Sequence, residues 1–185
     1  MSTDALIHKI FEDYELNHKS LIDRQELSFA NDYKNQSAKV VLLACASFFE
    51  SKILEEIIKV LNTTNCDLTK NFLLNKTLIR QYHTLFDWNG ANANSFFKLF
   101  GEEYSKYMKD KIKSDKFLEQ AIKDFLELGS LRNQLVHCNY ATFKLELTIE
   151  DIKAKFESAQ NFVNAINVLS DEFKISLSLK SGPVA

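Results

Sequence analysis

Apolar side chains recur at intervals of three and four residues along most of this chain, which places them on one face of an α-helix. The pattern is strongest over residues 36–61, where it predicts a long helix. The apolar stripe of that helix consists of Val40, Val41, Leu43, Ala44, Phe48, Ile53, Leu54, Ile57, Ile58 and Leu61. The same spacing predicts helices over residues 3–31, 69–86, 95–113, 115–137 and 148–173, with breaks near Asn17 and at Gly101.

Residues with strong capping or turn preferences mark the ends of several predicted helices. Asp115 can cap the helix that follows it, and Thr148 with Asp151 has the spacing of a capping box. Residues 87–94, which are rich in asparagine, predict a loop. Gly129 falls inside a helical pattern, where glycine costs about 1 kcal/mol relative to alanine. We therefore expect a close helix crossing or a bend at that position.

These elements predict an all-α fold, an antiparallel bundle of five to six helices joined mostly by short loops. A content of 4 Gly and 1 Pro in 185 residues argues against a sandwich or barrel of many short strands. The 15 Phe residues predict an aromatic core. We expect residues 1–175 to form a single domain and residues 176–185 a flexible C-terminal tail, with a short extended segment at 143–147.

The charge and cysteine content narrow the function classes. A formal net charge of -2 argues against a generic nucleic-acid coat, because such proteins neutralise phosphates with an excess of basic residues. Cys45, Cys66 and Cys138 match no zinc pattern, and no cofactor motif is present, so we expect neither metal nor cofactor. The first residues do not resemble a signal peptide and no apolar run is long enough to span a membrane, so the chain is expected to be cytoplasmic.

One short segment carries the chemistry. Arg132, Asn133 and His137 lie close together near the end of a predicted amphipathic helix. Asn133 and His137 are four residues apart and share a face, whereas Arg132 is offset from His137 by about 140°. Histidine can move a proton near neutral pH, arginine grips phosphate with a planar fork, and asparagine can orient either group.

This combination suits metal-independent cleavage of RNA, in which the 2′-hydroxyl is the nucleophile. The protein then supplies proton transfer and stabilises the charge that develops on the phosphoryl group. The motif supplies one histidine per chain, which is little for this chemistry, but two copies facing each other in a dimer would supply both a base and an acid. A structural interpretation also stands, because arginine and histidine near a helix C-terminus suit the helix dipole.

Two further features allow two interpretations each. Trp88 in the loop at 87–94 can stack on bases or can anchor the loop by packing. The lysine-rich residues 106–113 can guide RNA or can form a solvated helix face.

An all-α bundle with Arg-Asn-x-x-x-His late in its penultimate long helix resembles a HEPN domain, in particular the stand-alone branch associated with RiboL-PSP. Arg132, Asn133 and His137 match the three positions of the HEPN motif. The segment at residues 46–50 resembles the acidic position of an earlier HEPN helix, which makes Glu50 the candidate supporting acid; a solvated glutamate is the alternative.

The resemblance implies a homodimeric, metal-independent endoribonuclease that acts on RNA in a toxin–antitoxin or phage-defence setting, with an antitoxin or defence-system protein as partner. Some HEPN toxins end the motif as His-x-Tyr, and that tyrosine is modified. In this chain the tyrosine is Tyr140, one position later, so the modification is not carried over. The alternative function is a catalytically inactive helical module that binds protein or RNA.

Overall fold

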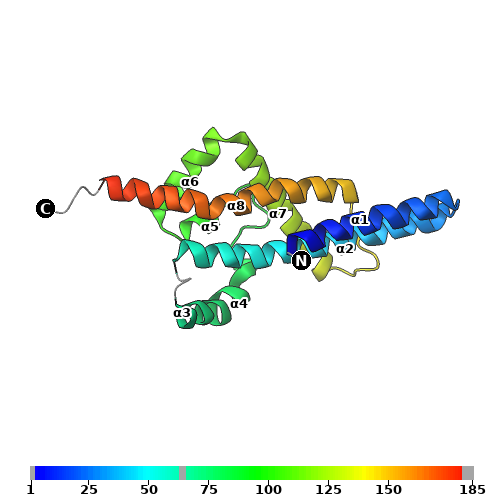
Figure 1. Ribbon diagram of the computed structural model, residues 1–185, viewed down its shortest axis with the longest axis horizontal. Helices are drawn as coiled ribbons and strands as arrows, with labels where there is room; N and C mark the ends of the chain where they lie inside the picture. The colour runs from blue at the N-terminus through cyan, green and yellow to red at the C-terminus, as the bar shows by residue number, and fades with distance from the viewer. Residues whose placement is uncertain (1–2, 63–65, 181–185) are drawn as a thin grey trace.

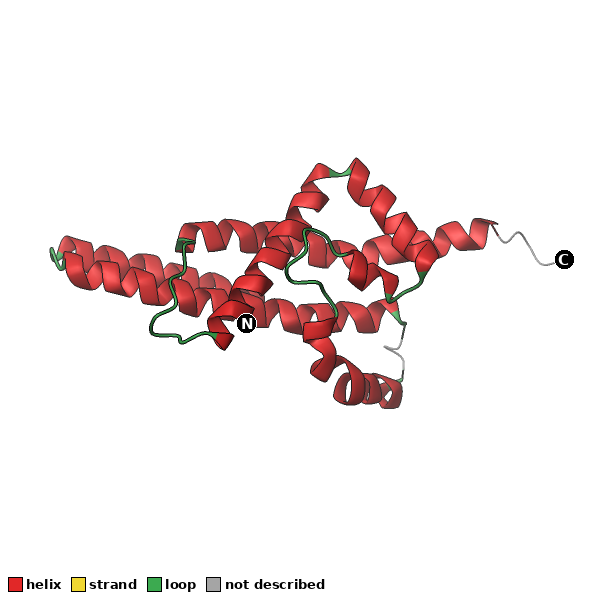
Figure 2. Cartoon of the chain, turned by 180° about the vertical axis from the view of Figure 1, so that it is seen from behind, coloured by secondary structure: helices red, strands yellow, loops and turns green. Residues whose placement is uncertain are grey.

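The computed structural model describes residues 3–62 and 66–180, and all regular structure within those ranges is helical (Figure 1). The elements in order are α1 (Thr3–Asp23), α2 (Leu27–Val60), α3 (Asp67–Phe72), η1 (Leu73–Leu78), α4 (Ile79–Gln81), η2 (Tyr82–Thr84), α5 (Asn94–Lys98), α6 (Glu102–Ser114), α7 (Lys116–His137) and α8 (Ile149–Lys180). Figure 2 shows the same all-helical architecture from behind. The predicted all-α bundle is therefore confirmed.

Helices α1 and α2 form an antiparallel hairpin that extends from the rest of the bundle (Figure 1). The predicted break near Asn17 is wrong, because α1 continues through that residue and ends at Asp23. The reversal comes at Gln25, whose φ of 61° lies in the left-handed region. Helix α2 therefore starts at Leu27, ahead of its predicted start at residue 36.

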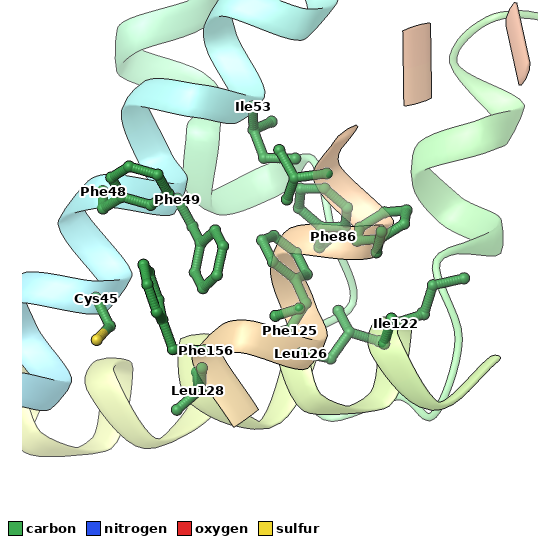
Figure 3. Close-up of a cluster of buried hydrophobic side chains, with 14 of the residues drawn as sticks. Cys45, Phe48, Phe49, Ile53, Phe86, Ile122, Phe125, Leu126, Leu128 and Phe156 are labelled. Atoms are coloured by element: carbon green, nitrogen blue, oxygen red, sulfur yellow. The ribbon is translucent and has the colours of Figure 1, made fainter. Parts of the chain in front are cut away.

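The core lies where α2, α7 and α8 pack together, and phenylalanine dominates it, as the composition predicts (Figure 3). The ring centroid of Phe49 on α2 lies 5.6 Å from that of Phe125 on α7 and 5.2 Å from that of Phe156 on α8. Each of these three rings is at most 2% exposed. Aromatic pairs at such distances stabilise the core beyond the burial of apolar surface alone.

The predicted helix caps are confirmed. One carboxylate oxygen of Asp115 accepts hydrogen bonds from the backbone N–H groups of Phe117 and Leu118, both at 3.0 Å. Before α8, the Thr148 N–H donates to Asp151 at 2.9 Å and the Asp151 N–H donates to the Thr148 hydroxyl at 3.1 Å. These two caps fix both ends of the segment that carries the Arg-Asn-x-x-x-His motif and leads into α8.

Other boundaries differ from the pattern. The predicted helix over residues 95–113 divides into α5 and α6 at Gly101, whose φ of 104° explains the glycine. The predicted helix over residues 69–86 is distorted, with a π-helical stretch at η1 and a 3₁₀ turn at η2. Residues 143–147 form no strand.

Helix α8 continues to Lys180, beyond its predicted end near Phe173, so residues 176–180 are helical and not a loose tail. The single-domain organisation stays a prediction, and the last five residues lie outside the described part.

Candidate active site

Arg132 and Asn133, two residues of the sequence motif, meet Glu50 where α7 crosses α2. The Arg132 guanidinium lies 3.7 Å from the Glu50 carboxylate, measured between Nη2 and Oε2. Its Nη1 donates a hydrogen bond of 3.1 Å to the amide oxygen of Asn133. The side chains of Arg132 and Glu50 are 24% and 28% exposed. The guanidinium is thus held by two partners and still reachable from solvent.

Aromatic residues outside the sequence motif form the base of this cluster. A cavity of about 10 Å³, the size of one water molecule, is lined by Tyr82, Trp88, Arg132 and Asn133 among others. Burial raises the pKa of the Tyr82 hydroxyl, Glu50 raises it further, and Arg132 lowers it. Tyr82 is therefore a neutral hydroxyl close to both members of the ion pair.

Gly129 has a specific packing role one helical turn before Arg132. A Cβ atom at this position would overlap the Trp88 indole ring, so only glycine lets the ring lie against α7. The predicted reason for this glycine, a close helix crossing or a bend, is therefore replaced by contact with a loop side chain. The Trp88 indole N–H also donates to the His83 carbonyl at 2.9 Å. Trp88 thus packs inward and anchors its loop, the second of the two interpretations drawn from the sequence.

His137 lies apart from this cluster. It is the last residue of α7, it is exposed, and it lies about 7.5 Å along the helix axis from Arg132. No hydrogen bond or ion pair links it to Arg132, Asn133 or Glu50 within the described part of one chain. The neighbouring apolar residues Val136 and Tyr140 are 53% and 40% exposed. The structure thus brings Glu50, Arg132 and Asn133 together and leaves His137 on an accessible, partly apolar surface.

After His137 the chain contacts α2 through Lys39, a residue that no sequence pattern distinguishes. The Lys39 ammonium group donates a hydrogen bond of 2.9 Å to the Tyr140 carbonyl and lies 4.9 Å from the centroid of the Tyr140 ring. This contact fixes the position of the loop that begins at the end of α7, and with it the surroundings of His137.

The three cysteines are free thiols. Cys45 is fully buried, and burial raises its pKa to about 12. Within the described residues, no cluster of three or more His, Cys, Asp or Glu side chains has the arrangement of a metal site. None of the described helices combines the length and apolarity that crossing a bilayer requires.

Chemically, the cluster presents one cation held beside one carboxylate. A partly exposed guanidinium, oriented by a carboxylate and an amide, can bind a phosphate with its free edge. An exposed imidazole further along the same helix can exchange protons with a ligand held there. The fold and this site thus define a class, an all-α bundle with a partly exposed polar cluster between two of its helices.

The family assignment agrees with that class. The family model RiboL-PSP-HEPN matches residues 7–171, so the chain belongs to the HEPN family. HEPN domains are generally associated with RNA cleavage, and they often bind RNA and dimerise. No curated protein and no solved structure matches the chain significantly.

Proposed function

We propose that the protein is a metal-independent endoribonuclease that cleaves RNA by attack of the 2′-hydroxyl on the adjacent phosphate. The bond between the 2′-oxygen and phosphorus forms and the bond to the 5′-oxygen breaks, which leaves a cyclic phosphate. One proton leaves the 2′-hydroxyl and one reaches the 5′-oxygen. The main support is the cluster that Arg132 and Asn133 of α7 form with Glu50 of α2. On α7 this cluster lies one to two turns before the exposed His137.

Each residue of the proposed site has a role that follows from its chemistry. Arg132 binds the scissile phosphate and stabilises the charge that develops on it. Glu50 acts as a positioning residue, because its carboxylate holds the guanidinium from α2. Asn133 accepts from Nη1 and keeps the fork of Arg132 in one orientation. His137 transfers the protons as general base or acid.

We further propose that two chains assemble so that their motifs line one cleft. The one motif histidine of each chain, His137, cannot act as base and acid at the same time, whereas two facing copies can. The exposed apolar residues beside His137 favour a contact of this kind, since such surface is stabilised when it is covered. A toxin–antitoxin or phage-defence setting, with a partner protein that controls the activity, is the biological context we propose.

Replacement of the histidine tests the proposed reaction. Purified protein is incubated with total RNA in buffer that contains EDTA, and the products are examined for cyclic phosphate ends. We expect cleavage by the parent protein and by His18→Ala, which removes a histidine of the distant α1, and no cleavage by His137→Ala. Circular dichroism and gel filtration should show that the His137→Ala fold and assembly are unchanged.

The opposite results would refute the assignment. If folded His137→Ala protein cuts RNA as fast as the parent, or if EDTA abolishes cleavage, the proposed reaction is wrong. The second candidate function is a catalytically inactive RNA-binding module, and the separation of His137 from the Arg132 cluster within one chain favours it. In that case RNA binding would depend on Arg132, and no variant would change the RNA products.

A further inference from the structure

A groove between α2 and the loop after α7 adds a binding site to the proposed active site. We propose that Lys39, on the floor of this groove, binds a second phosphate of the same RNA strand that reaches Arg132. This inference rests on the proposed function and adds the path of the substrate backbone.

The groove is a large hollow beside the end of α7, with a volume of about 750 Å³. One wall is the N-terminal half of α2 and the other is the loop that leads to α8. Its lining residues are Asp32, Lys34, Asn35, Gln36, Ala38, Lys39, Ala141, Phe143, Lys144, Leu145, Glu146, Leu147 and Thr148. A volume of this size falls in the range of sites that enclose small ligands, so it has room for part of a nucleotide chain.

Lys39 is unusual among the buried charges of this protein. The residue is 5% exposed, yet its ammonium group contacts only the carbonyl and the ring of Tyr140, and no ion pair with a carboxylate is found for it in the described ranges. By contrast, buried Glu56 pairs with Lys59 at 2.6 Å and buried Asp124 pairs with Lys155 at 3.1 Å. Buried charges are normally paired, and an ammonium group has three donors. A compact anion in the groove would supply the partner that the chain does not.

The geometry of α2 aligns this lysine with the proposed active site. Lys39 and Glu50 are about 11 residues apart on α2, which at 3.6 residues per turn is three turns and about 20° of rotation. The two residues therefore lie on the same face of the helix, about 16 Å apart along its axis. Arg132 contacts Glu50, and Tyr140 contacts Lys39. The segment from 132 to 140 therefore contacts α2 at both ends, beside Glu50 and beside Lys39.

The charges at the rim fit a polyanion with several contacts better than an isolated small acid. Lys34 and Lys144 join Lys39, and Asp32 and Glu146 oppose them, which leaves one net positive charge in the lining. Lys34 also lies 3.9 Å from Glu150. With so small a net charge, the groove alone attracts an anion only weakly. A ligand that also contacts Arg132 binds more tightly than one that contacts the groove alone. RNA, with a phosphate at every residue, meets this condition.

The test measures RNA binding as a function of salt. All proteins carry His137→Ala, so that a fluorescently labelled single-stranded RNA is not cut, and the dissociation constant is measured at several NaCl concentrations. Lys39→Met keeps the length and apolar stem of the side chain and removes its charge. The matched control is Lys52→Met, because Lys52 is about 13 residues away and lies on the opposite side of α2. Since Lys39 is buried, the exposed Lys144→Gln is the second test variant.

We expect Lys39→Met to weaken binding several-fold at low salt and to reduce the slope of log K against log salt by about 0.7, the loss of one phosphate contact with a single strand. Lys144→Gln should reduce the slope in the same direction, and Lys52→Met should leave it unchanged. A purely structural clamp on Tyr140 would alter affinity or thermal stability without changing the slope, and that result overturns the inference.

The two proposals fail separately. If neither lysine variant changes the slope while the parent protein still cleaves RNA and His137→Ala does not, only the second phosphate site is wrong. If a polyglutamate peptide binds and Lys39→Met abolishes that binding with RNA binding unaffected, the groove takes an acidic protein segment instead. If the parent protein neither binds nor cuts RNA, both proposals fall.

Discussion

Replacing Gly129 by alanine should destabilise the protein, although the same change stabilises an ordinary helix. In the middle of a helix, alanine is favoured over glycine by about 1 kcal/mol. Here the added Cβ would overlap the Trp88 ring, which is packed against Tyr82, Phe86 and Phe125 and cannot move alone. Forcing an extra carbon into such a site costs about 1–3 kcal/mol. After the helix preference is subtracted, we expect Gly129→Ala to lower the free energy of unfolding by up to about 2 kcal/mol.

Urea denaturation followed by circular dichroism measures this change, and a double-mutant cycle isolates its cause. In a Trp88→Ala background the ring is gone, so Gly129→Ala should regain its ordinary helix-stabilising effect of about 1 kcal/mol. The change of sign between the two backgrounds is the critical result. If Gly129→Ala stabilises the protein while Trp88 is present, the packing argument is wrong. If it destabilises both backgrounds equally, something other than the indole ring opposes the new carbon.

Three further predictions concern other parts of the chain. Asp115→Ala should cost about 1 kcal/mol in urea denaturation because two backbone N–H groups lose their acceptor, whereas Asp115→Asn should cost less. Hydrogen bonds from Lys116 and then Lys123 lower the pKa of the Glu119 carboxyl to about 2. The ionised carboxylate therefore stabilises the folded state above pH 4.5, and this stabilisation is lost as the pH falls toward 2. An NMR titration should show a higher pKa for this carboxyl when both lysines are replaced by alanine, and an unchanged value would contradict the assignment. Glu50→Gln should lower the cleavage rate less than His137→Ala does, because it loosens the guanidinium without removing a reacting group; an unchanged rate would exclude the positioning role.

The sequence predicts best those parts of the helices whose position depends on nearby residues of the same segment. The apolar stripe of α2, the Asp115 cap and the Thr148–Asp151 capping box are local patterns, and the two caps agree with the structure. The stripe agrees in its central part, but its end members Val40 and Leu61 are 52% and 44% exposed. The turn between α1 and α2 differs from its predicted position because Gln25 adopts a left-handed conformation without being glycine or asparagine. By their spacing, the first residues of α2 belong to the preceding predicted helix, and Leu27, which is 64% exposed, adds nothing to the inward-facing stripe of α2.

The residues of the candidate site also differ in how far the sequence alone indicates them. Arg132 and Asn133 are adjacent along the chain, so the sequence alone indicates that they act together. Glu50 required the family resemblance, since it lies on a different helix from Arg132 and only the crossing of α2 and α7 brings them together. Tyr82 reaches the site, and Lys39 reaches the loop after α7, through tertiary packing alone, and no local spacing marks either of them. Their roles therefore required the folded chain.

Trp88, the only tryptophan in the chain, gives this protein an optical reporter at its proposed site. The indole is half-buried and lines the same small cavity as Arg132 and Asn133. Its emission should therefore respond when an anion draws the guanidinium away from Glu50. Binding can then be followed by intrinsic fluorescence with unlabelled ligands and with the unmodified protein.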